Sequence, residues 1–172
     1  LIFRRFADDT STKKFAFALK EKPKDIMEIN LGIDLGGSGS GHSFTATAIT
    51  RGFQMVVPLA SEWINCKDES GNPLEIDPDM LGKMFCNFVQ KILNRYGYVT
   101  VVYADSAEQT LIAGIRSSLR KNGLGWIRVE NALKTEINDR INATSILMAQ
   151  GRFAYMDGEC DSLVTALCTA VW

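Results

Sequence analysis

Histidine and cysteine are scarce in this sequence, and their scarcity limits the metal sites that it can form. The 172 residues include one histidine, His42, and four cysteines, with no CxxC pair among them. A metal ion would therefore be held mainly by carboxylates, which favours hard cations such as magnesium or manganese. We expect reduced cysteines, because a small buried thiol explains those in apolar helical patterns.

Long apolar runs and an excess of one charge are also absent. No apolar run approaches the roughly 20 residues of a membrane span, and the N-terminus has no signal-peptide pattern, so we expect a soluble, cytoplasmic protein with no membrane partner. Lys and Arg number 19, against 20 Asp and Glu. The chain has no overall basic bias, so a polyanion would have to be met by a local patch or through cations.

The length and the hydrophobic content of 46% suit one domain with a sizeable core and an appendage. The appendage is residues 1–28, a basic edge hairpin or tether that is closed by Pro23. Solvation explains its charges better than contact with a nucleic acid does. Because the chain starts without Met and stops within an apolar helical pattern, we expect residues 29–172 to be one domain of a longer protein.

The order of apolar patterns predicts an α/β domain. Residues 28–35, 43–50 and 53–59 have β-type composition and short connections, which predicts an antiparallel meander of three strands. Helices at 78–97, 106–122, 135–150 and from 161 alternate with strands at 98–104, 126–129 and, at an edge, 153–156. Met80 lies on the apolar face of the first helix, and Ile137 and Ile146 lie on that of the third. This order predicts a mixed sheet flanked by helices.

The most distinctive stretch surrounds Asp34. An apolar run ends on Asp34 and breaks into glycines, and a second apolar run, residues 98–104, ends on Asp105. If the two strands are parallel and adjacent, both carboxylates lie at one edge of the sheet, where open α/β sheets place their sites. Two carboxylates at such a short distance either share a proton or bind a cation.

Two further acids are candidates for the same site. Asp161 stands at the start of the last helix, and Glu108 lies one turn into its helix on the side facing Asp105. Three or four carboxylates suit divalent cations and two-metal cleavage of a phosphodiester. Simpler roles are a helix N-cap for Asp161 and a favourable charge in a first helical turn for Glu108. Asp34 and Asp105 are harder to explain structurally, because a buried strand that ends on an unpaired acid is costly.

Other motifs overlap the glycine-rich stretch. A P-loop spacing is matched by residues 36–43, GGSGSGHS, except that His42 replaces the lysine that holds the phosphates. Residues 32–36, GIDLG, resemble the phosphate loop of actin-like sugar kinases and chaperones, which are far longer proteins that share a ribonuclease-H-like core. No GxSxG nucleophile elbow is completed, so the glycines form a flexible turn in which His42 would orient a phosphate or a water near the metals.

Three acidic motifs resemble those of the nuclease domain of bacteriophage terminase large subunits. They are residues 33–36, IDLG, residues 103–108, YADSAE, and residues 161–167, DSLVTAL, of which YADSAE is the most specific. The resemblance covers about residues 29–172. It implies a ribonuclease-H-like endonuclease that cuts concatemeric double-stranded viral DNA during packaging. Two Mg²⁺ or Mn²⁺ ions would be held by Asp34, Asp105 and Asp161, with Glu108 as a further candidate, although the last motif has Ser162 and Thr165 where a second acid can stand.

The resemblance also implies partners. A packaging ATPase domain normally precedes the nuclease, so residues 1–28 would be its trailing linker, and the small terminase subunit and the portal would be partners in the host cell cytoplasm. Double-stranded DNA would need cations at the rim, for which we select Lys134, Arg128 and Arg140, with His42. Such phosphate contacts would give salt-dependent, sequence-indifferent binding. The alternatives are a DNA-binding module that has lost catalysis and a nucleotide-binding fragment.

Overall fold

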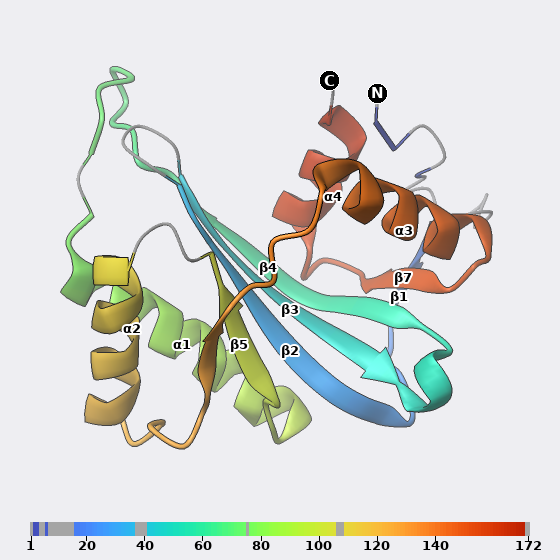
Figure 1. The fold of residues 1–172 in the computed structure, drawn as a ribbon, viewed down its shortest axis with the longest axis horizontal. Coiled ribbons are helices and arrows are strands. Elements are labelled where there is room, and N and C mark those ends of the chain that lie inside the picture. Colours follow the sequence, from blue (N-terminus) through green and yellow to red (C-terminus); the bar gives the residue numbers. More distant parts are fainter. Residues whose placement is uncertain are drawn as a thin grey trace. The chain divides into compact units, whose positions relative to one another are not determined.

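The computed structural model describes residues 2–3, 6, 16–36, 41–74, 76–105 and 109–170. Within them seven strands form one sheet in the order β1-β7-β4-β3-β2-β5-β6 (Figure 1). The strands are β1 (Ala16–Leu19), β2 (Ile26–Leu35), β3 (His42–Thr50), β4 (Val56–Ile64), β5 (Val101–Ala104), β6 (Val129–Asn131) and β7 (Phe153–Met156). The helices are α1 (Pro78–Tyr96), α2 (Gln109–Lys121), α3 (Ile137–Ala149), α4 (Asp161–Thr169) and the short 3-10 helix η1 (Arg51–Phe53).

The sheet confirms the predicted fold class. The consecutive strands β2, β3 and β4 are neighbours, as a meander requires, whereas β5 pairs in parallel with both β2 and β6. The architecture is therefore a mixed α/β sheet with helices, of the ribonuclease-H-like kind. None of the helices in the described ranges is long and apolar enough to cross a membrane.

The chain divides into two compact units. The first comprises residues 1–28, 45–62 and 133–172, and the second comprises residues 29–44 and 63–132. The first unit contains β1, β7, α3 and α4. The second contains α1, β5, α2 and β6, together with most of β2.

In the second unit α1 forms where the sequence predicts it. Asp77 caps its start by accepting a hydrogen bond from the backbone N–H of Met80 at 2.8 Å, Pro78 follows, and Gly97 ends the helix in the left-handed region. The side chain of Met80 itself is 51% exposed, so its predicted inward position is wrong: it lies in the first turn, before the buried stripe begins at Leu81.

The core of the second unit lies between its strands and its two helices, which run side by side (Figure 1). Phe44 of β3 packs edge-on against Phe85 of α1, with ring centroids 5.1 Å apart, and also contacts Phe88. A side chain at Gly82 would overlap the hydroxyl of Ser118 on α2. The glycine therefore lets the two helices approach closely, as small residues at helix crossings do.

The first unit has a small core around β7. Met148 of α3 and Phe153 of β7 are buried, and Phe3, Phe6, Leu147 and Leu167 pack against them. β7 pairs in parallel with β1 and begins beside Val56 of β4, so it is an inner strand and the predicted edge position is wrong. All four side chains of β7 are buried, and an inner strand that is buried on both faces accounts for its continuous apolar sequence.

Three other predictions need adjustment. Ile137 and Ile146 of α3 are more than half exposed, because the helix buries Met148 near its end, with Leu147 packed against the same core. The strand predicted at 126–129 starts at Val129, since the chain turns there first, with the N–H of Ile127 bonded to the carbonyl of Leu124. The start predicted for the second helix at 106 falls outside the described residues, within which α2 begins at Gln109.

Candidate active site

The parallel pairing of β2 with β5 brings Asp34 and Asp105 together. Ile33 is the register partner of Ala104, so the two aspartates, one residue further on, are side by side on strands about 4.8 Å apart. The backbone N–H of Asp105 donates to the carbonyl of Ile33 at 3.3 Å, which continues the ladder to the end of both strands. The carboxyl ends of parallel strands are where open α/β sheets place their sites.

Both aspartates face the side of the sheet that carries Gly32 and Tyr103. Burial alternates along β2, with Ile33 and Leu35 buried and Asp34 exposed between them, and Asp105 is half-buried. The carboxylate pair is therefore open to solvent and to a ligand. Two such neighbouring negative charges favour a cation between them.

Tyr103 and Glu130 lie on the same face of the sheet as the two aspartates, and neither was selected from the sequence as a site residue. The register aligns Gly32, Tyr103 and Glu130 across three strands, and Gly32 and Tyr103 each lie two residues before an aspartate. Tyr103 is 39% exposed between two buried neighbours, and a side chain at Gly32 would meet nothing within 4 Å. The signal that would have found Tyr103 is its position two residues before Asp105, since alternate residues of a strand share a face.

Asp161 is the first residue of α4 and is exposed. Its suggested role as N-cap is wrong, because the N-cap is Cys160 and its side chain makes no capping hydrogen bond. The cap comes instead from Ser61 of β4, whose hydroxyl accepts from the backbone N–H of Leu163 at 3.1 Å and lies 2.6 Å from the hydroxyl of Ser162. Asp161 and Ser61 belong to the first unit and Asp34 and Asp105 to the second, so a site common to all three aspartates stays a prediction.

The structure describes His42 but not the candidate ligand Glu108. Glu108 lies outside the described residues, as do residues 37–40 of the predicted glycine turn. His42 is the first residue of β3 and is 5% exposed. The chain therefore enters a strand at His42, whereas a P-loop leads into a helix, so the structure argues against the P-loop interpretation. A side chain at the preceding Gly41 would overlap the ring of Trp63, which packs across the glycine and remains 57% exposed.

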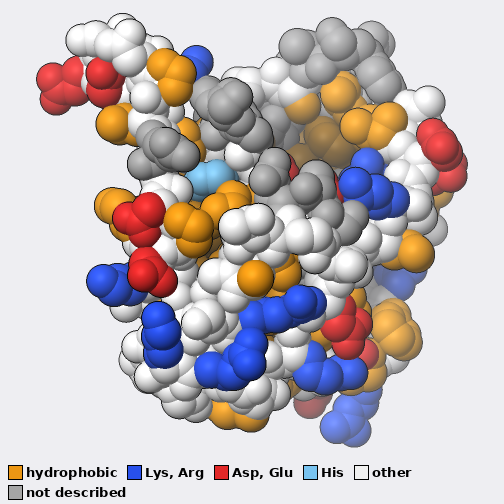
Figure 2. All heavy atoms as spheres, turned by 60° about the vertical axis from the view of Figure 1, so that its left-hand side comes forward, with side chains coloured by type: hydrophobic (Ala, Val, Ile, Leu, Met, Phe, Trp, Pro, Cys, Tyr) orange, Lys and Arg blue, Asp and Glu red, His pale blue; other side chains and the backbone are white. Residues whose placement is uncertain are grey.

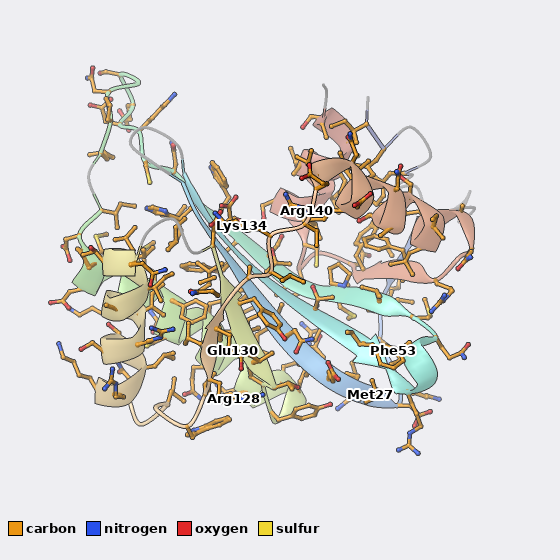
Figure 3. All side chains as sticks on the ribbon, viewed as in Figure 1. Met27, Phe53, Arg128, Glu130, Lys134 and Arg140 are labelled. Atoms are coloured by element: carbon orange, nitrogen blue, oxygen red, sulfur yellow. The ribbon has the colours of Figure 1, made fainter. Side chains whose placement is uncertain are left out.

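The basic candidates belong to different units. Arg128, which comes directly before β6, is ion-paired with Glu130 of that strand, with 3.1 Å between guanidinium nitrogen and carboxylate oxygen (Figure 3). Lys134 and Arg140 are exposed and belong to the first unit, the former before α3 and the latter on it. Their contacts with DNA remain predictions.

The donor set at the Asp34 edge fits a hard divalent cation. Both aspartates supply only oxygen ligands, one exposed and one half-buried, and Mg²⁺ is commonly held by one or two carboxylates with the remaining positions taken by water and phosphate. Among the described residues no group of three or more His, Cys, Asp and Glu side chains is placed to hold a metal ion. None of the four cysteines forms a disulfide, and Cys66, Cys86 and Cys160 are buried.

This combination of a mixed sheet and acid-ended parallel strands defines a ribonuclease-H-like domain. No protein-family model matches the sequence, and no curated protein matches it. Solved structures do match, and they include large terminases and terminase nuclease domains. The large terminase of a thermophilic bacteriophage aligns over 96% of this chain and 35% of its own, with a TM-score of 0.65 and 14% identity.

Two isolated nuclease domains are also similar. The human cytomegalovirus terminase nuclease domain has a TM-score of 0.62 and 13% identity over 84% of this chain and 76% of its own. The nuclease domain of the large terminase from bacteriophage SPP1, solved with bound Mn, has a TM-score of 0.55 and 16% identity over 84% of this chain and 69% of its own. The fold is thus that of large-terminase nuclease domains, and the chain spans about a third of the length of the thermophilic phage protein.

Proposed function

We propose that this chain is the nuclease domain of a large terminase, which cleaves concatemeric double-stranded viral DNA during genome packaging. The observation that carries the proposal is the register of β2 and β5, which leaves Asp34 and Asp105 side by side at one sheet edge. The likeness to large-terminase nuclease folds supports the choice of DNA as substrate.

In this proposal Asp34, Asp105 and Asp161, with Glu108 as a further ligand, hold two Mg²⁺ or Mn²⁺ ions. These ions would supply activation of the attacking water and stabilisation of the leaving oxygen. Asp105 is the more rigid donor, because it is half-buried and its backbone N–H is bonded to Ile33. Asp34 is exposed, so its carboxylate would be accessible to an ion that also binds the phosphodiester.

The exposed basic side chains would hold the DNA backbone near the scissile bond. Lys134 and Arg140 are the exposed candidates of one unit and Arg128 is that of the other, whereas the predicted contact of His42 conflicts with its burial. Arg128 shares its charge with Glu130, so it gives a weaker phosphate contact than a cation without an acidic partner. These contacts would be independent of base sequence.

We further propose that residues 1–28 are the trailing linker of a packaging ATPase domain and that residues 29–172 are the nuclease domain. Strand β1 then ties the end of the linker to the nuclease, since it pairs in parallel with β7. The small terminase subunit and the portal are the proposed partners, in the host cell cytoplasm.

Plasmid nicking in the presence of Mn²⁺ tests the proposal. The variants Asp34→Asn, Asp105→Asn and Asp161→Asn remove a charge at nearly constant shape, and each is expected to abolish nicking while the melting temperature is kept. Asp139→Asn is the matched control, because Asp139 is also an exposed first-turn acid, in α3, with no assigned role. Mn²⁺ titration calorimetry of the same variants reports the loss of metal binding independently of cleavage.

Each alternative has its own outcome in the same set of measurements. Full nicking by all three variants refutes the assignment of the site. DNA binding without nicking at any Mg²⁺ or Mn²⁺ concentration identifies a binding module that has lost catalysis. An increase in melting temperature with ATP identifies a nucleotide-binding fragment.

A further inference from the structure

A basic pocket lies at the outer edge of β6, away from the aspartate pair. Its volume is about 280 Å³, and its lining residues are Arg116, Leu119, Arg120, Gly125, Ile127 and Val129. Lys and Arg side chains gather on the lower part of the face that Figure 2 brings forward. All of the lining residues belong to the second unit, so the pocket is formed within one compact body.

Arg116 is fixed in this pocket by the sheet edge. β6 ends the strand order, so the carbonyls on its outer side have no neighbouring strand within the described residues. Arg116 donates from its Nη2 to one of them, the carbonyl of Val129, at 2.8 Å. A guanidinium has five N–H donors in a rigid fork, so this single bond orients the group and leaves donors for a ligand.

Arg120 lies one turn further along α2 and is held in a similar way. Its Nε donates to the backbone carbonyl of Arg116 at 3.3 Å, and its stem passes over Gly125. A Cβ at position 125 would be 2.9 Å from the Cγ of Arg120, so glycine makes room for the arginine. Two preoriented guanidiniums thus line one small cavity.

Within the described part of the chain, no carboxylate neutralises the charge of this pocket. Like charges four residues apart on a helix repel each other. The carboxylates nearby are engaged elsewhere, Asp79 with Lys121 and Glu130 with Arg128, and among the described residues neither Arg116 nor Arg120 has an acidic partner. Paired guanidiniums of this kind match the oxygens of a phosphate.

We propose that this pocket binds a backbone phosphate of duplex DNA and so anchors the substrate at a distance from the cleavage site, an inference that rests on the proposed function. Val129 is the register partner of Val102 of β5, and Tyr103 and the aspartates lie on the opposite face of the sheet. The phosphate that the pocket anchors is therefore a different one from the scissile phosphate.

The salt dependence of DNA binding tests the pocket. The affinity of the chain for a short duplex of mixed sequence is measured by fluorescence anisotropy in EDTA, so that no cleavage occurs. Arg120→Gln is expected to lower the slope of log affinity against log salt by about 0.9, the value for one lost phosphate contact. Between about 50 and 200 mM KCl, the affinity of this variant then falls about 3.5-fold less than that of the unmodified chain.

Three controls separate a specific contact from a change of net charge or of fold. Arg95→Gln removes the same charge from the exposed surface of α1, where Arg95 lies over the Tyr96 ring, and is expected to leave the slope unchanged. Arg120→Lys keeps a point charge and is expected to restore the slope. Arg116→Lys is expected to weaken binding, because a single ammonium cannot reproduce a fork that also holds Val129. Melting temperatures verify that each variant is folded.

The outcomes distinguish this inference from the proposed function. A slope for Arg120→Gln equal to that of the unmodified chain overturns the inference, even if Mn²⁺-dependent nicking is observed. Protection by inorganic phosphate against thermal unfolding, lost in Arg120→Gln while the DNA slope stays the same, identifies a free-phosphate site and also overturns it. A lowered slope in a chain that never nicks DNA supports the pocket and refutes the nuclease.

Discussion

Ser61 is expected to hold the start of α4, although the two lie about a hundred residues apart in sequence. Its hydroxyl accepts the backbone N–H of Leu163 and is hydrogen-bonded to the hydroxyl of Ser162. It therefore replaces the capping side chain that Cys160 does not provide. Ser61→Ala removes this cap and leaves a partly buried N–H without its acceptor.

The loss of a capping side chain costs about 1–2 kcal/mol. For a domain of this size, each kcal/mol lowers the melting temperature by about 2–4 °C, so Ser61→Ala is expected to melt about 2–8 °C lower. Urea unfolding followed by circular dichroism measures the same loss as a lower midpoint at constant slope. If Asp161 binds metal as proposed, the variant also needs more Mn²⁺ for half-maximal nicking, because α4 then holds the aspartate less firmly.

Ser162→Ala is the matched control. It removes one hydroxyl from the same pair but keeps the bond between Ser61 and Leu163, so its loss of stability is expected to be smaller, about 0.5–1.5 kcal/mol. Ser61→Thr keeps the hydroxyl and is expected to restore part of the cap. The reasoning is refuted if Ser61→Ala melts with the unmodified chain, or if Ser162→Ala is the less stable of the two.

Three further predictions concern stability and titration. Phe85→Ala removes a fully buried ring that packs edge-on against Phe44, and it is expected to cost about 3–5 kcal/mol in chemical unfolding; a loss below about 1 kcal/mol would contradict the assigned core. Burial raises the pKa of the Cys86 thiol, with a smaller opposing effect of Asn122. The folded state therefore favours the neutral thiol, and the resulting contribution to the free energy of unfolding is present below the unfolded-state pKa and is lost as the pH rises through the folded-state pKa. Thiol labelling is therefore expected to modify the exposed Cys168 before Cys86. Hydrogen bonds from Asn72 lower the pKa of Asp68, because they favour the ionised carboxylate. The resulting contribution to the free energy of unfolding is present above the unfolded-state pKa and is lost as the pH falls through the folded-state pKa. Asn72→Ala is expected to raise the folded-state pKa of Asp68 in an NMR titration.

Local signals in the sequence were sufficient for some elements. The start of α1 is specified by Asp77 and the proline that follows it, and its end by Gly97, so its bounds follow from neighbouring residues. The pairing of Asp34 with Asp105 was predictable only in part. Each apolar run is followed by its aspartate, but β3, β4 and α1 lie between β2 and β5, so the sequence left open whether the two strands are parallel and adjacent.

Contacts between distant segments determined what the sequence could not reveal. Ser61 caps α4 by accepting from the N–H of Leu163 across a separation of 102 residues, and no local pattern around either residue predicts that bond. The buried face of α3 depends on β7, so periodicity alone selected Ile146 where the structure buries Met148. Tyr103 was missed because it looks like one more apolar residue in a buried run until the register shows which face it occupies.

The packing of Trp63 across Gly41 has a consequence for sequence variation at the start of β3. The indole ring and the backbone carbonyl of Ile64 both occupy the volume that any side chain at position 41 would need. Position 41 is therefore expected to stay glycine even where residue 63 is smaller, because replacing Trp63 leaves the Ile64 carbonyl in place. A combinatorial library at positions 41 and 63, selected for folding, would recover glycine at 41 with varied residues at 63, whereas Gly32, where an added Cβ meets nothing within 4 Å, would vary freely.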